Sequence, residues 1–535
     1  MNDGMTSMEL KPGMIAPGVH IHVVGIGGAG MSAIARVLLG RGYRVSGSDQ
    51  QANSQTAALA VEGVAVFIGH NAANIDGADM LLISSAVPAT NVEWLTARER
   101  GLPVLKRADL LGQLMRGSIG IAVAGTHGKT TTTGMIAHLL LEVGLDPTVI
   151  LGGTLDELGG NGRYGAGPHF VIEADEYDYM FLGLRPEIAV ITNVEHDHPD
   201  LFPTAEAYRA AFRQFAEQLP VDNSRLIICA DDPGAVELLD ELTTAAVTNA
   251  GIDVITYGLG SLPRSETPTV RALDPRPNRI GGHDFIVEVD GQTIGLARLR
   301  VPGLHNVRNG LAAIIVGLGL QLDFATICRA LAGFGGVQRR FQLIGEVGRG
   351  DSGGDVTIID DYAHHPTEIR ATLAAARQRY PGRRLWAVWQ PHTFSRTRLL
   401  ADEFAGSFDS ADRVIALDIY GSREAEAPLA PRERVGERDA DENSLAPRER
   451  VGEREADPPR PITTADIVGR MSHPQAVYIP DRRAATAYLL ERVSPGDVIL
   501  TLGAGDGNMV GRWLLEELQR QRGVTKPGLP GQPSI

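Results

Sequence analysis

Short apolar runs alternate with helix-length stretches along most of the chain. Apolar residues dominate 20–24, 119–124 and 188–192, which predicts buried strands. The stretches between the strands carry apolar residues at helical spacing, as in the predicted helix 130–143. Because strands that are apolar on both faces are typical of parallel sheets covered by helices, the pattern predicts an α/β fold.

The alternation falls into three groups, and 535 residues are too many for one ordinary core. We therefore predict three α/β domains. The N-terminal domain is Rossmann-like and covers 1–117. A central domain of the phosphate-loop type covers 118–337, and a second Rossmann-like domain covers 338–535.

The secondary structure of three stretches of the central domain can be predicted separately. Alternating residues in 285–289 and 293–300 flank Asp290-Gly291, which indicates a hairpin. Aromatic residues at helical spacing predict an amphipathic helix over 204–218. The Gly-, Pro- and Arg-rich segment 259–284 predicts no regular element.

The strand 119–124 ends in a glycine-rich turn. Small residues allow backbone N–H groups to surround a phosphate, and the following helix adds the positive end of its dipole. The usual pattern has a glycine where this chain has Val123, so the loop is a variant. Lys129 would contact the β- and γ-phosphates of ATP, and Thr130 would bind Mg²⁺. The predicted ATP-binding loop comprises Gly125, Thr126, His127, Gly128, Lys129, Thr130 and Thr131.

Two further strands of the central domain end in polar clusters. One strand is followed by Glu173, and another by Asn193 and His198. Ligands of open α/β sheets bind beyond the carboxyl ends of strands, so we expect these clusters and the loop on one rim. The predicted metal ligands are Glu173 and His198 beside Thr130. With Lys129 and Asn193, they form the predicted catalytic group.

A second glycine-rich loop follows the first predicted strand. Residues 25–31 have the spacing Gly-x-Gly-x-x-Gly before a helix, and Asp49 follows the next strand. This arrangement is typical of the first βαβ unit of a Rossmann-like domain. On its own it indicates a nucleotide or dinucleotide, so an NAD-dependent oxidoreductase stays open as an alternative. The predicted ligand contacts in this loop are Gly27, Gly28, Ala29, Gly30 and Met31.

Composition narrows the class of protein. The net charge of −15 argues against a nucleic-acid-binding surface, because such surfaces are basic. No apolar run is long enough to span a bilayer, so we expect no membrane insertion. Cys229 and Cys328 have no CxxC partner, which predicts two buried, reduced thiols in a cytoplasmic protein.

Several motifs together resemble the Mur ligases of bacterial cell-wall synthesis. They are Gly125–Thr131, Glu173–Glu176, Thr192–His198, Pro302–Asn309 and Arg339–Phe341. The resemblance covers nearly the whole chain. The motifs most similar to the members that join L-alanine to UDP-N-acetylmuramate are Gly25–Met31, Asp361–Pro366 and Gln390–His392.

The resemblance implies a reaction and its substrates. ATP, with Mg²⁺, would phosphorylate the carboxylate of UDP-N-acetylmuramate, and the amine of L-alanine would then displace phosphate from the acyl phosphate. The N-terminal domain would bind the UDP substrate, which displaces the NAD interpretation. Besides the glycine loop, the residues implied in binding that substrate are Asp49, His70, Ser84 and Arg107.

The resemblance also assigns residues of the other two domains. His305, Asn306 and Asn309 would approach adenine, and Asn306 is equally a candidate helix cap. The nucleotide would be held from the C-terminal side by Arg340 and Asp361. The alanine and the muramyl carboxylate would be placed by His364, which joins the catalytic group, and by Arg396.

A sister activity stays open within the family. The segment Glu173–Asp178 also resembles the ligases that recycle murein tripeptides. Tyr177 stands where the alanine-adding members usually carry serine, and Thr393-Phe394 stand where they carry Arg-Tyr. The chain is expected to act as a monomer or dimer.

One segment departs from the α/β pattern. The sequence of Leu429–Arg438 recurs identically as Leu445–Arg454, and most of the surrounding residues are charged, Pro or Gly. Such a composition buries too little apolar surface to order itself, so we predict a disordered insertion over 425–460 and a disordered tail over 523–535.

Deletion of 425–460 tests this prediction. Because the segment contributes no core, we expect a variant with unchanged cooperative unfolding and catalytic activity, measured by circular dichroism and phosphate release. Loss of folding would show that the insertion belongs to the folded structure.

Overall fold

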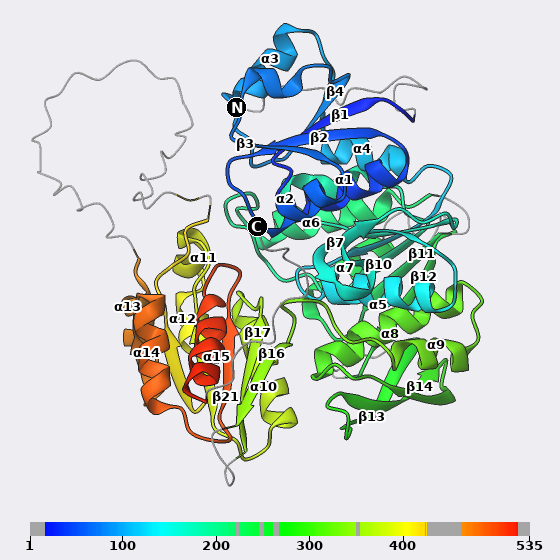
Figure 1. Cartoon of the computed structure of the whole chain (residues 1–535). Helices are drawn as coiled ribbons and strands as arrows, with labels where there is room; N and C mark the ends of the chain where they lie inside the picture. The colour runs from blue at the N-terminus through cyan, green and yellow to red at the C-terminus, as the bar shows by residue number, and fades with distance from the viewer. Residues whose placement is uncertain are drawn as a thin grey trace, which may run out of the picture.

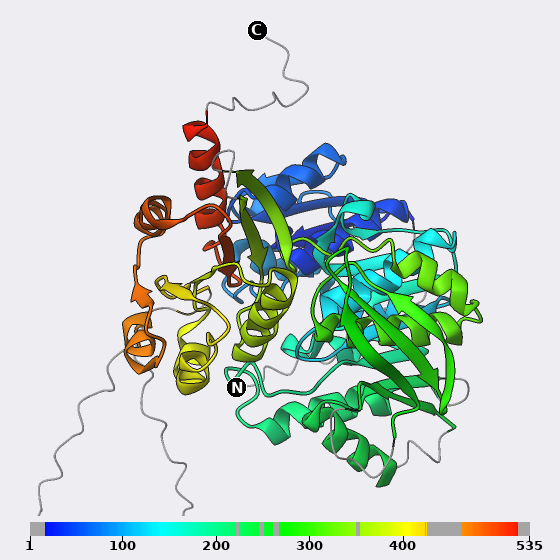
Figure 2. The same ribbon diagram turned by 90° about the horizontal axis from the view of Figure 1, so that it is seen from below.

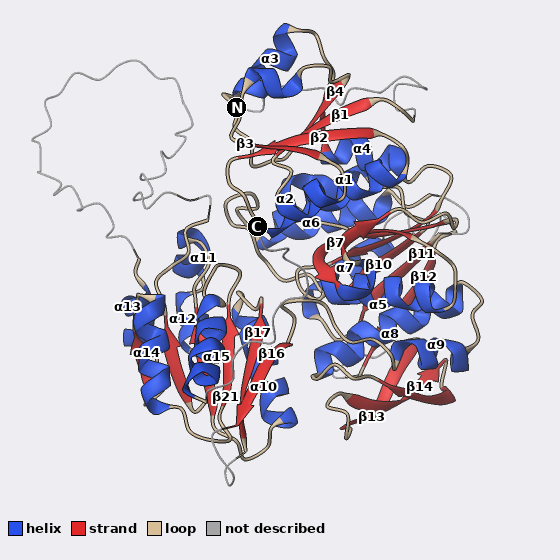
Figure 3. Ribbon diagram, in the orientation of Figure 1, coloured by secondary structure: helices blue, strands red, loops and turns tan. Residues whose placement is uncertain are grey.

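Three β-sheets with helices packed against them form the described part of the chain (Figure 1, Figure 3). None of the described helices is long and apolar enough to cross a membrane. The predicted insertion 425–460 and tail 523–535 lie outside the described residues. The computed structural model describes residues 17–220, 224–244, 251–260, 267–348, 354–422, 424 and 462–522.

The N-terminal unit contains a parallel sheet with strand order β3-β2-β1-β4-β5. The strand order reverses between β1 and β4, since β2 and β3 lie on one side of β1 and β4 and β5 on the other. The glycine loop after β1 therefore lies at the switch point of a Rossmann-like sheet. Its strands are β1 (His20–Val24), β2 (Arg44–Asp49), β3 (Ala65–Ile68), β4 (Met80–Ile83) and β5 (Val104–Lys106). Its helices are α1 (Ala29–Gly40), α2 (Ser54–Val61), η1 (Ala72–Ile75), α3 (Val92–Glu99) and α4 (Arg107–Leu114).

The central unit is built on a sheet with strand order β15-β14-β13-β12-β11-β10-β6-β9-β7-β8. Strand β6 lies between β10 and β9, so the turn after it is flanked by the ends of both neighbours. The strands are β6 (Ile119–Ala124), β7 (Thr148–Leu155), β8 (Gly160–Arg163), β9 (His169–Glu173), β10 (Ile188–Ile191), β11 (Arg225–Cys229), β12 (Asp253–Gly258), β13 (Val270–Pro277), β14 (His283–Val289) and β15 (Gln292–Arg298). The helices are α5 (Lys129–Glu142), η2 (Asp156–Leu158), η3 (Tyr177–Gly183), α6 (Ala205–Glu217), α7 (Pro233–Thr244), α8 (Leu304–Gly319) and α9 (Phe324–Leu331).

The edge of this sheet corrects one prediction. The hairpin around Asp290-Gly291 is confirmed as β14 and β15. The prediction that 259–284 has no regular element is wrong, because β13 pairs there with β14. Buried Val270 and Ala272 anchor this strand, whereas its Pro- and Arg-rich end is exposed and gives no strand signal.

The C-terminal unit has strand order β16-β17-β21-β18-β19-β20, and β16 alone among these strands pairs antiparallel. It lies to one side of the central unit (Figure 1, Figure 2). Its strands are β16 (Gln342–Gly348), β17 (Asp355–Asp361), β18 (Leu385–Trp389), β19 (Arg413–Ala416), β20 (Ala476–Tyr478) and β21 (Val498–Leu502). Its helices are α10 (Pro366–Arg379), α11 (Phe394–Leu399), α12 (Ala401–Ala405), α13 (Thr464–Arg470), α14 (Arg482–Arg492) and α15 (Met509–Gln521).

Alternating side chains of the central strands enter cores on opposite faces of the sheets. On β18, Leu385, Ala387 and Trp389 join one apolar cluster, while Trp386 and Val388 join another. Burial on both faces explains why these strands are continuous apolar runs in the sequence.

The N-terminal and central units share one apolar cluster. It includes Ile34 and Leu111 from the first unit and Ile172 and Phe212 from the second. The amphipathic helix predicted over 204–218 is confirmed as α6, in which Phe212 is buried. Of the two cysteines, Cys229 is buried as predicted, but Cys328 is only half-buried.

Candidate active site

The loop between β6 and α5 has the backbone geometry of a phosphate-binding turn. Gly125 has φ +135° and Gly128 has φ +81°, values that residues with side chains rarely adopt. A Cβ on Gly125 would lie 2.0 Å from Oγ1 of Thr192, and one on Gly128 would lie 2.8 Å from Oδ1 of Asn309. Conformation and space therefore both require glycine, and α5 points its free N–H groups at the loop.

The end of β10 holds this loop in place. Oγ1 of Thr192 donates to the His127 carbonyl at 2.6 Å, and Oδ1 of Asn193 accepts from the His127 N–H at 2.8 Å. Oγ1 of Thr126 donates to the Glu195 carbonyl at 2.8 Å and accepts from the Glu195 N–H at 2.9 Å. Asn193, predicted as catalytic, thus lies against the loop backbone and fixes its shape.

The ammonium of Lys129, at the start of α5, is enclosed by acceptors. Nζ donates to the carbonyls of Gly125 at 2.5 Å and Thr126 at 3.1 Å, and to Oε2 of Glu176 at 2.8 Å. Burial lowers the pKa of Lys129, but Glu176 and Asp175 more than offset this and leave that pKa raised. Burial raises the pKa of Glu176, yet Lys129 brings it down to about 2. Both groups are therefore charged at neutral pH.

Glu176 is absent from the predicted site residues, although it stands in the same acidic run as Glu173. Its carboxylate accepts from the Tyr208 hydroxyl at 3.1 Å and lies 3.5 Å from Nε2 of His198. The acidic run was a signal for such a residue. The path of the turn after β9 decides which carboxylate of this run faces the Lys129 ammonium, and the sequence does not show that path.

Two of the three predicted Mg²⁺ ligands are in contact. Oγ1 of Thr130 donates to Oε1 of Glu173 at 2.9 Å, and Oε2 of Glu173 accepts from the Gly152 N–H at 2.7 Å. Burial raises the pKa of Glu173. A half-buried carboxylate beside a hydroxyl provides the oxygen ligands that Mg²⁺ prefers, so these residues fit the ion. His198, the third predicted ligand, pairs with Glu176 instead.

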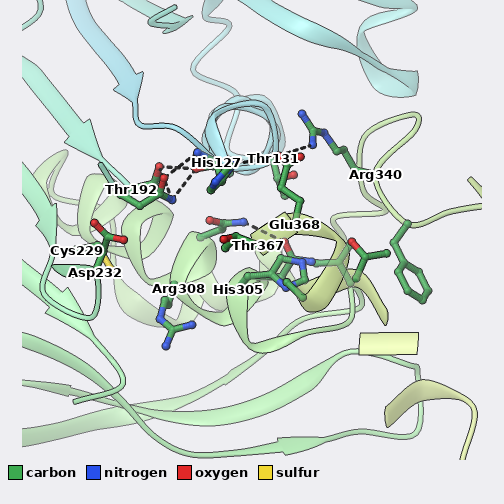
Figure 4. Close-up of a pocket in the computed structure, with 18 of the residues that line it drawn as sticks. His127, Thr131, Thr192, Cys229, Asp232, His305, Arg308, Arg340, Thr367 and Glu368 are labelled. Atoms are coloured by element: carbon green, nitrogen blue, oxygen red, sulfur yellow. Dashed lines mark hydrogen bonds and ion pairs between the residues drawn. The ribbon is translucent and has the colours of Figure 1, made fainter. Parts of the chain in front are cut away.

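A cavity of about 300 Å³ lies beside the loop, between the central and C-terminal units (Figure 4). Residues of the loop, of α8 and of the first turns of the C-terminal unit point toward it. Its volume suits a small-molecule ligand. The predicted ATP-binding residues that line it are His127, Gly128, Thr131, His305, Asn306, Asn309, Arg340 and Asp361.

The first turn of α8 presents amides to this cavity. The helix is capped by Gly303, so the predicted cap role of Asn306 is wrong. Nδ2 of Asn306 donates to the Pro302 carbonyl at 2.7 Å, and its Oδ1 accepts from Asn309 at 3.0 Å. Burial lowers the pKa of His305 to about 4, so this ring is neutral and offers one donor and one acceptor.

His127 joins the phosphate loop to the C-terminal unit. Its ring lies between Oε2 of Glu195 at 2.8 Å and Oε1 of Glu368 at 3.2 Å. Thr367 donates to Glu195 at 2.8 Å, and the His365 ring lies 4.7 Å from that of His127. Burial lowers the pKa of His127, but the two carboxylates raise it to about 9. The bridge therefore carries a positive charge at neutral pH.

The pair Arg396–Asp197 forms a second bridge between the same units. The two side chains are only 4% and 5% exposed. Nε and Nη2 of Arg396 donate to Asp197 at 2.8 to 3.0 Å, and Nη1 lies 3.0 Å from Nδ1 of His392. Burial raises the pKa of Asp197, but Arg396 outweighs this and holds it well below its usual range. His364 is close by, its ring 5.8 Å from that of His392.

The residues predicted to bind the UDP substrate gather at the N-terminus of α1. The Gly27 N–H donates to Oδ2 of Asp49 at 2.9 Å. A Cβ on Gly25 would lie 3.1 Å from that of Ser84, so this turn packs directly on the end of β4. The structure therefore brings these parts of the first unit together on one rim of its sheet.

Arg107 lies between this rim and the central unit. A Cβ on Gly30 would approach its Nη1 to 2.9 Å, and the same atom lies 3.3 Å from Oδ2 of Asp175. His70 lies on the same rim, where its Nδ1 is 3.0 Å from Oγ of Ser48. Arg107 thus connects the glycine loop of the first unit with the acidic run of the second.

Family models match three successive parts of the chain. The model "Mur ligase family, catalytic domain" matches 20–118, "Mur ligase middle domain" matches 123–317, and "Mur ligase, glutamate ligase domain" matches 339–505. This chain belongs to the Mur ligase family.

Relatives of this Mur ligase match it over nearly their whole length. It is 41% identical to the UDP-N-acetylmuramate–L-alanine ligase of Salinibacter ruber, over 91% of this chain and 92% of the relative. It is 42% identical to the protein of that name from Roseiflexus castenholzii, over 93% and 97%. The crystal structure of the UDP-N-acetylmuramate-alanine ligase of Thermotoga maritima is similar, with TM-score 0.72, 28% identity, and coverage of 94% and 99%.

Replacing Gly125 with alanine should damage the phosphate loop. Both φ and the 2.0 Å approach to Thr192 oppose a Cβ there, whereas Gly144 has φ +77° and open space around it. We expect Gly144→Ala to lower the free energy of unfolding by about 1–2 kcal/mol, and Gly125→Ala to lower it further and abolish ATP binding by calorimetry. Wild-type ATP affinity in Gly125→Ala would contradict this account of the loop.

The charge on His127 should make stability pH-dependent. Its pKa is about 9 in the folded protein, above the ordinary value of about 6.5. The stabilisation is therefore fully present below pH ~6.5 and is lost as pH rises through ~9. Compared with His127→Gln, the wild type should be more stable on the order of 2 kcal/mol at pH 6.5, with a smaller difference at pH 9.5. A difference that is constant across this range in denaturant unfolding would refute a charged bridge.

Proposed function

We propose that this protein is an ATP-dependent ligase that joins L-alanine to UDP-N-acetylmuramate through an acyl phosphate. The observation that carries the proposal is the match over nine-tenths of the chain to relatives of that name. The phosphate loop, the carboxylate beside Thr130 and the cavity between two units supply the parts that such a reaction needs.

The chemistry requires two anions, the γ-phosphoryl group and the muramyl carboxylate, to approach each other. The ammonium of Lys129 would exchange part of its contact with Glu176 for the γ-phosphate and stabilise the transferring charge. Thr130, Glu173 and His198 would hold Mg²⁺, which would supply positive charge against the phosphates. Asn193 would keep the loop in the conformation that presents its N–H groups.

Each unit has a proposed share in the reaction. The N-terminal unit, over 1–117, binds the UDP substrate through its glycine loop. The central unit, over 118–337, binds ATP and the metal. In the C-terminal unit, over 338–535, His364 and Arg396 place the alanine and the muramyl carboxylate. Approach of this last unit excludes water from an acyl phosphate that water would otherwise hydrolyse.

Arg396 needs to move for this role. In the structure its guanidinium is bound by Asp197 and lies beside His392. Substrate carboxylate would compete with Asp197 for the same fork of donors, which is suited to bidentate carboxylate binding. The proposal therefore places the muramyl carboxylate beside Arg396 of α11.

The proposed reaction has a place in the cell. ATP and nucleotide sugars are cytoplasmic metabolites, so we infer a cytoplasmic enzyme that acts as a monomer or dimer. Its product would be a peptidoglycan precursor, and its loss would affect cell-wall synthesis, cell shape and division.

Two other activities are not favoured. A murein tripeptide recycling ligase shares the acidic run Glu173–Asp178, but the two curated relatives are named for L-alanine. An NAD-dependent oxidoreductase would use the first glycine loop and leave the phosphate loop without a function.

Phosphate release tests the proposal and separates these alternatives. With ATP, Mg²⁺ and UDP-N-acetylmuramate, we expect release that depends on L-alanine and falls on the order of 10²–10³-fold in Lys129→Met, because that variant removes the main cation at the γ-phosphate. Release with murein tripeptide alone would select the recycling ligase. No release above background with any amino acid or tripeptide would overturn the ligase proposal.

A further inference from the structure

A carboxylate with no exposed surface lies behind the rim of the N-terminal sheet. Glu93, in the first turn of α3, is 0% exposed. Its Oε2 accepts from Oγ of Ser48 at 2.5 Å and lies 3.0 Å from Nδ1 of His70. Its Oε1 accepts from Nδ2 of Asn74 at 2.6 Å and from the Asn71 N–H at 3.3 Å. The side chain of Glu93 thus contacts both the end of β2 and the loop after β3.

These contacts lie directly behind residues placed at the UDP substrate. Ser48 precedes Asp49, whose Oδ2 accepts from the N–H of Gly27 in the glycine loop. His70 contacts the same Oε2 as Ser48, and its side chain retains 16% exposure, so its ring reaches the surface of the rim. Glu93 is therefore in contact with two residues of the proposed substrate edge while remaining out of reach of a ligand.

Among the described residues, no lysine or arginine pairs with this carboxylate, and its partners are Ser48, His70, Asn71 and Asn74. Burial raises the pKa of Glu93, but the neighbouring His22, Ser48 and Asn74 bring it down to about 2. Ser48 and Asn74 donate at 2.5 and 2.6 Å, whereas Nε2 of His22 lies 3.9 Å from the carboxylate. Burying an ion costs free energy, and fully satisfied donors around it rigidify the loops that carry them.

The chemistry of a carboxylate fixes the orientation of His70. An ionised carboxylate only accepts hydrogen bonds, and the hydroxyl hydrogen of Ser48 is already donated to it, so Nδ1 of His70 faces two acceptors and must carry a hydrogen. In the neutral ring, Nε2 is then an acceptor. No hydrogen bond to Nε2 of His70 occurs among the described residues, which leaves this atom for a ligand.

We propose that Glu93 is a positioning residue that holds His70 as the Nδ1–H tautomer, with Nε2 accepting from an O–H or N–H donor of the nucleotide-sugar substrate. The inference rests on the proposed function, since it takes the ligand to be UDP-N-acetylmuramate. It adds a requirement that the substrate present a donor, a sugar hydroxyl or the uracil N–H, at this point of the rim.

A double-mutant cycle tests whether Glu93 acts through His70. We expect Glu93→Gln and His70→Ala each to raise KM for UDP-N-acetylmuramate about 10–100-fold, with kcat and the KM for ATP changed less than about twofold. Because the two residues act as one unit, the double variant should have no higher KM for UDP-N-acetylmuramate than His70→Ala alone. Additive losses, or an unchanged KM in Glu93→Gln, would overturn the proposal.

Asp497→Asn is the matched control. Asp497 is likewise a buried carboxylate with several donors, among them Arg384 and Trp386, but it lies in the C-terminal unit. The variant Asp497→Asn should unfold at a lower temperature and leave KM for UDP-N-acetylmuramate unchanged. A rise in that KM equal to the rise in Glu93→Gln would show a general effect of instability and overturn the specific role.

A measurement on the wild type does not depend on the folding of Glu93→Gln. In protein with ¹⁵N-labelled histidine, the His70 signals, assigned by their loss in His70→Ala, should report the Nδ1–H tautomer. An Nε2–H tautomer would overturn the proposal. Calorimetric binding of UDP-N-acetylmuramate to the wild type is measured beside it. If no binding occurs while the tautomer is Nδ1–H, the proposed substrate fails and the donor requirement falls with it, whereas the positioning of His70 by Glu93 stands.

Discussion

A buried charge pair fixes the centre of this protein. Lys129 and Glu176 hold each other 2.8 Å apart inside the central unit, and the loop carbonyls enclose the same ammonium. A buried cation is tolerable only when such partners surround it. The glycine turn, the end of β10 and the acidic run after β9 converge because each supplies a partner to the pair or to the loop that carries it. Thr130, the next residue of the helix, donates to Glu173, and these two are the proposed metal ligands.

The C-terminal unit is tied to this centre by charge. The cationic His127 lies between carboxylates from two units, and Arg396 crosses to a buried Asp197. Breaking a buried pair leaves an uncompensated charge, so these bridges favour one arrangement of the units. A ligand that satisfies the same groups can replace a bridge. This gives a physical means by which substrate binding and the position of the unit are coupled.

Local signals in the sequence predicted the three sheets, the glycine turns and the residues of the phosphate loop, because these depend on short-range pattern. Strand β13 was unpredictable since its stability comes from pairing with β14 and not from its Pro- and Arg-rich end. Glu93 and Glu368 were equally hidden, because each acts through a partner distant in the chain and a lone acidic residue in an acidic protein carries no signal of its own. Glu176 stands in a visible acidic run, but only the fold shows that it is the carboxylate facing Lys129.

The central claim is that the loop activates a carboxylate by phosphorylation. An oxygen-18 transfer experiment tests it most directly. If the carboxylate of UDP-N-acetylmuramate attacks the γ-phosphorus and the amine then displaces phosphate, one carboxylate oxygen leaves with the phosphate. With the carboxylate labelled in both oxygens, the account predicts one ¹⁸O in each phosphate released during ligation, read by mass spectrometry. Phosphate without ¹⁸O, formed together with the amide product, would contradict it.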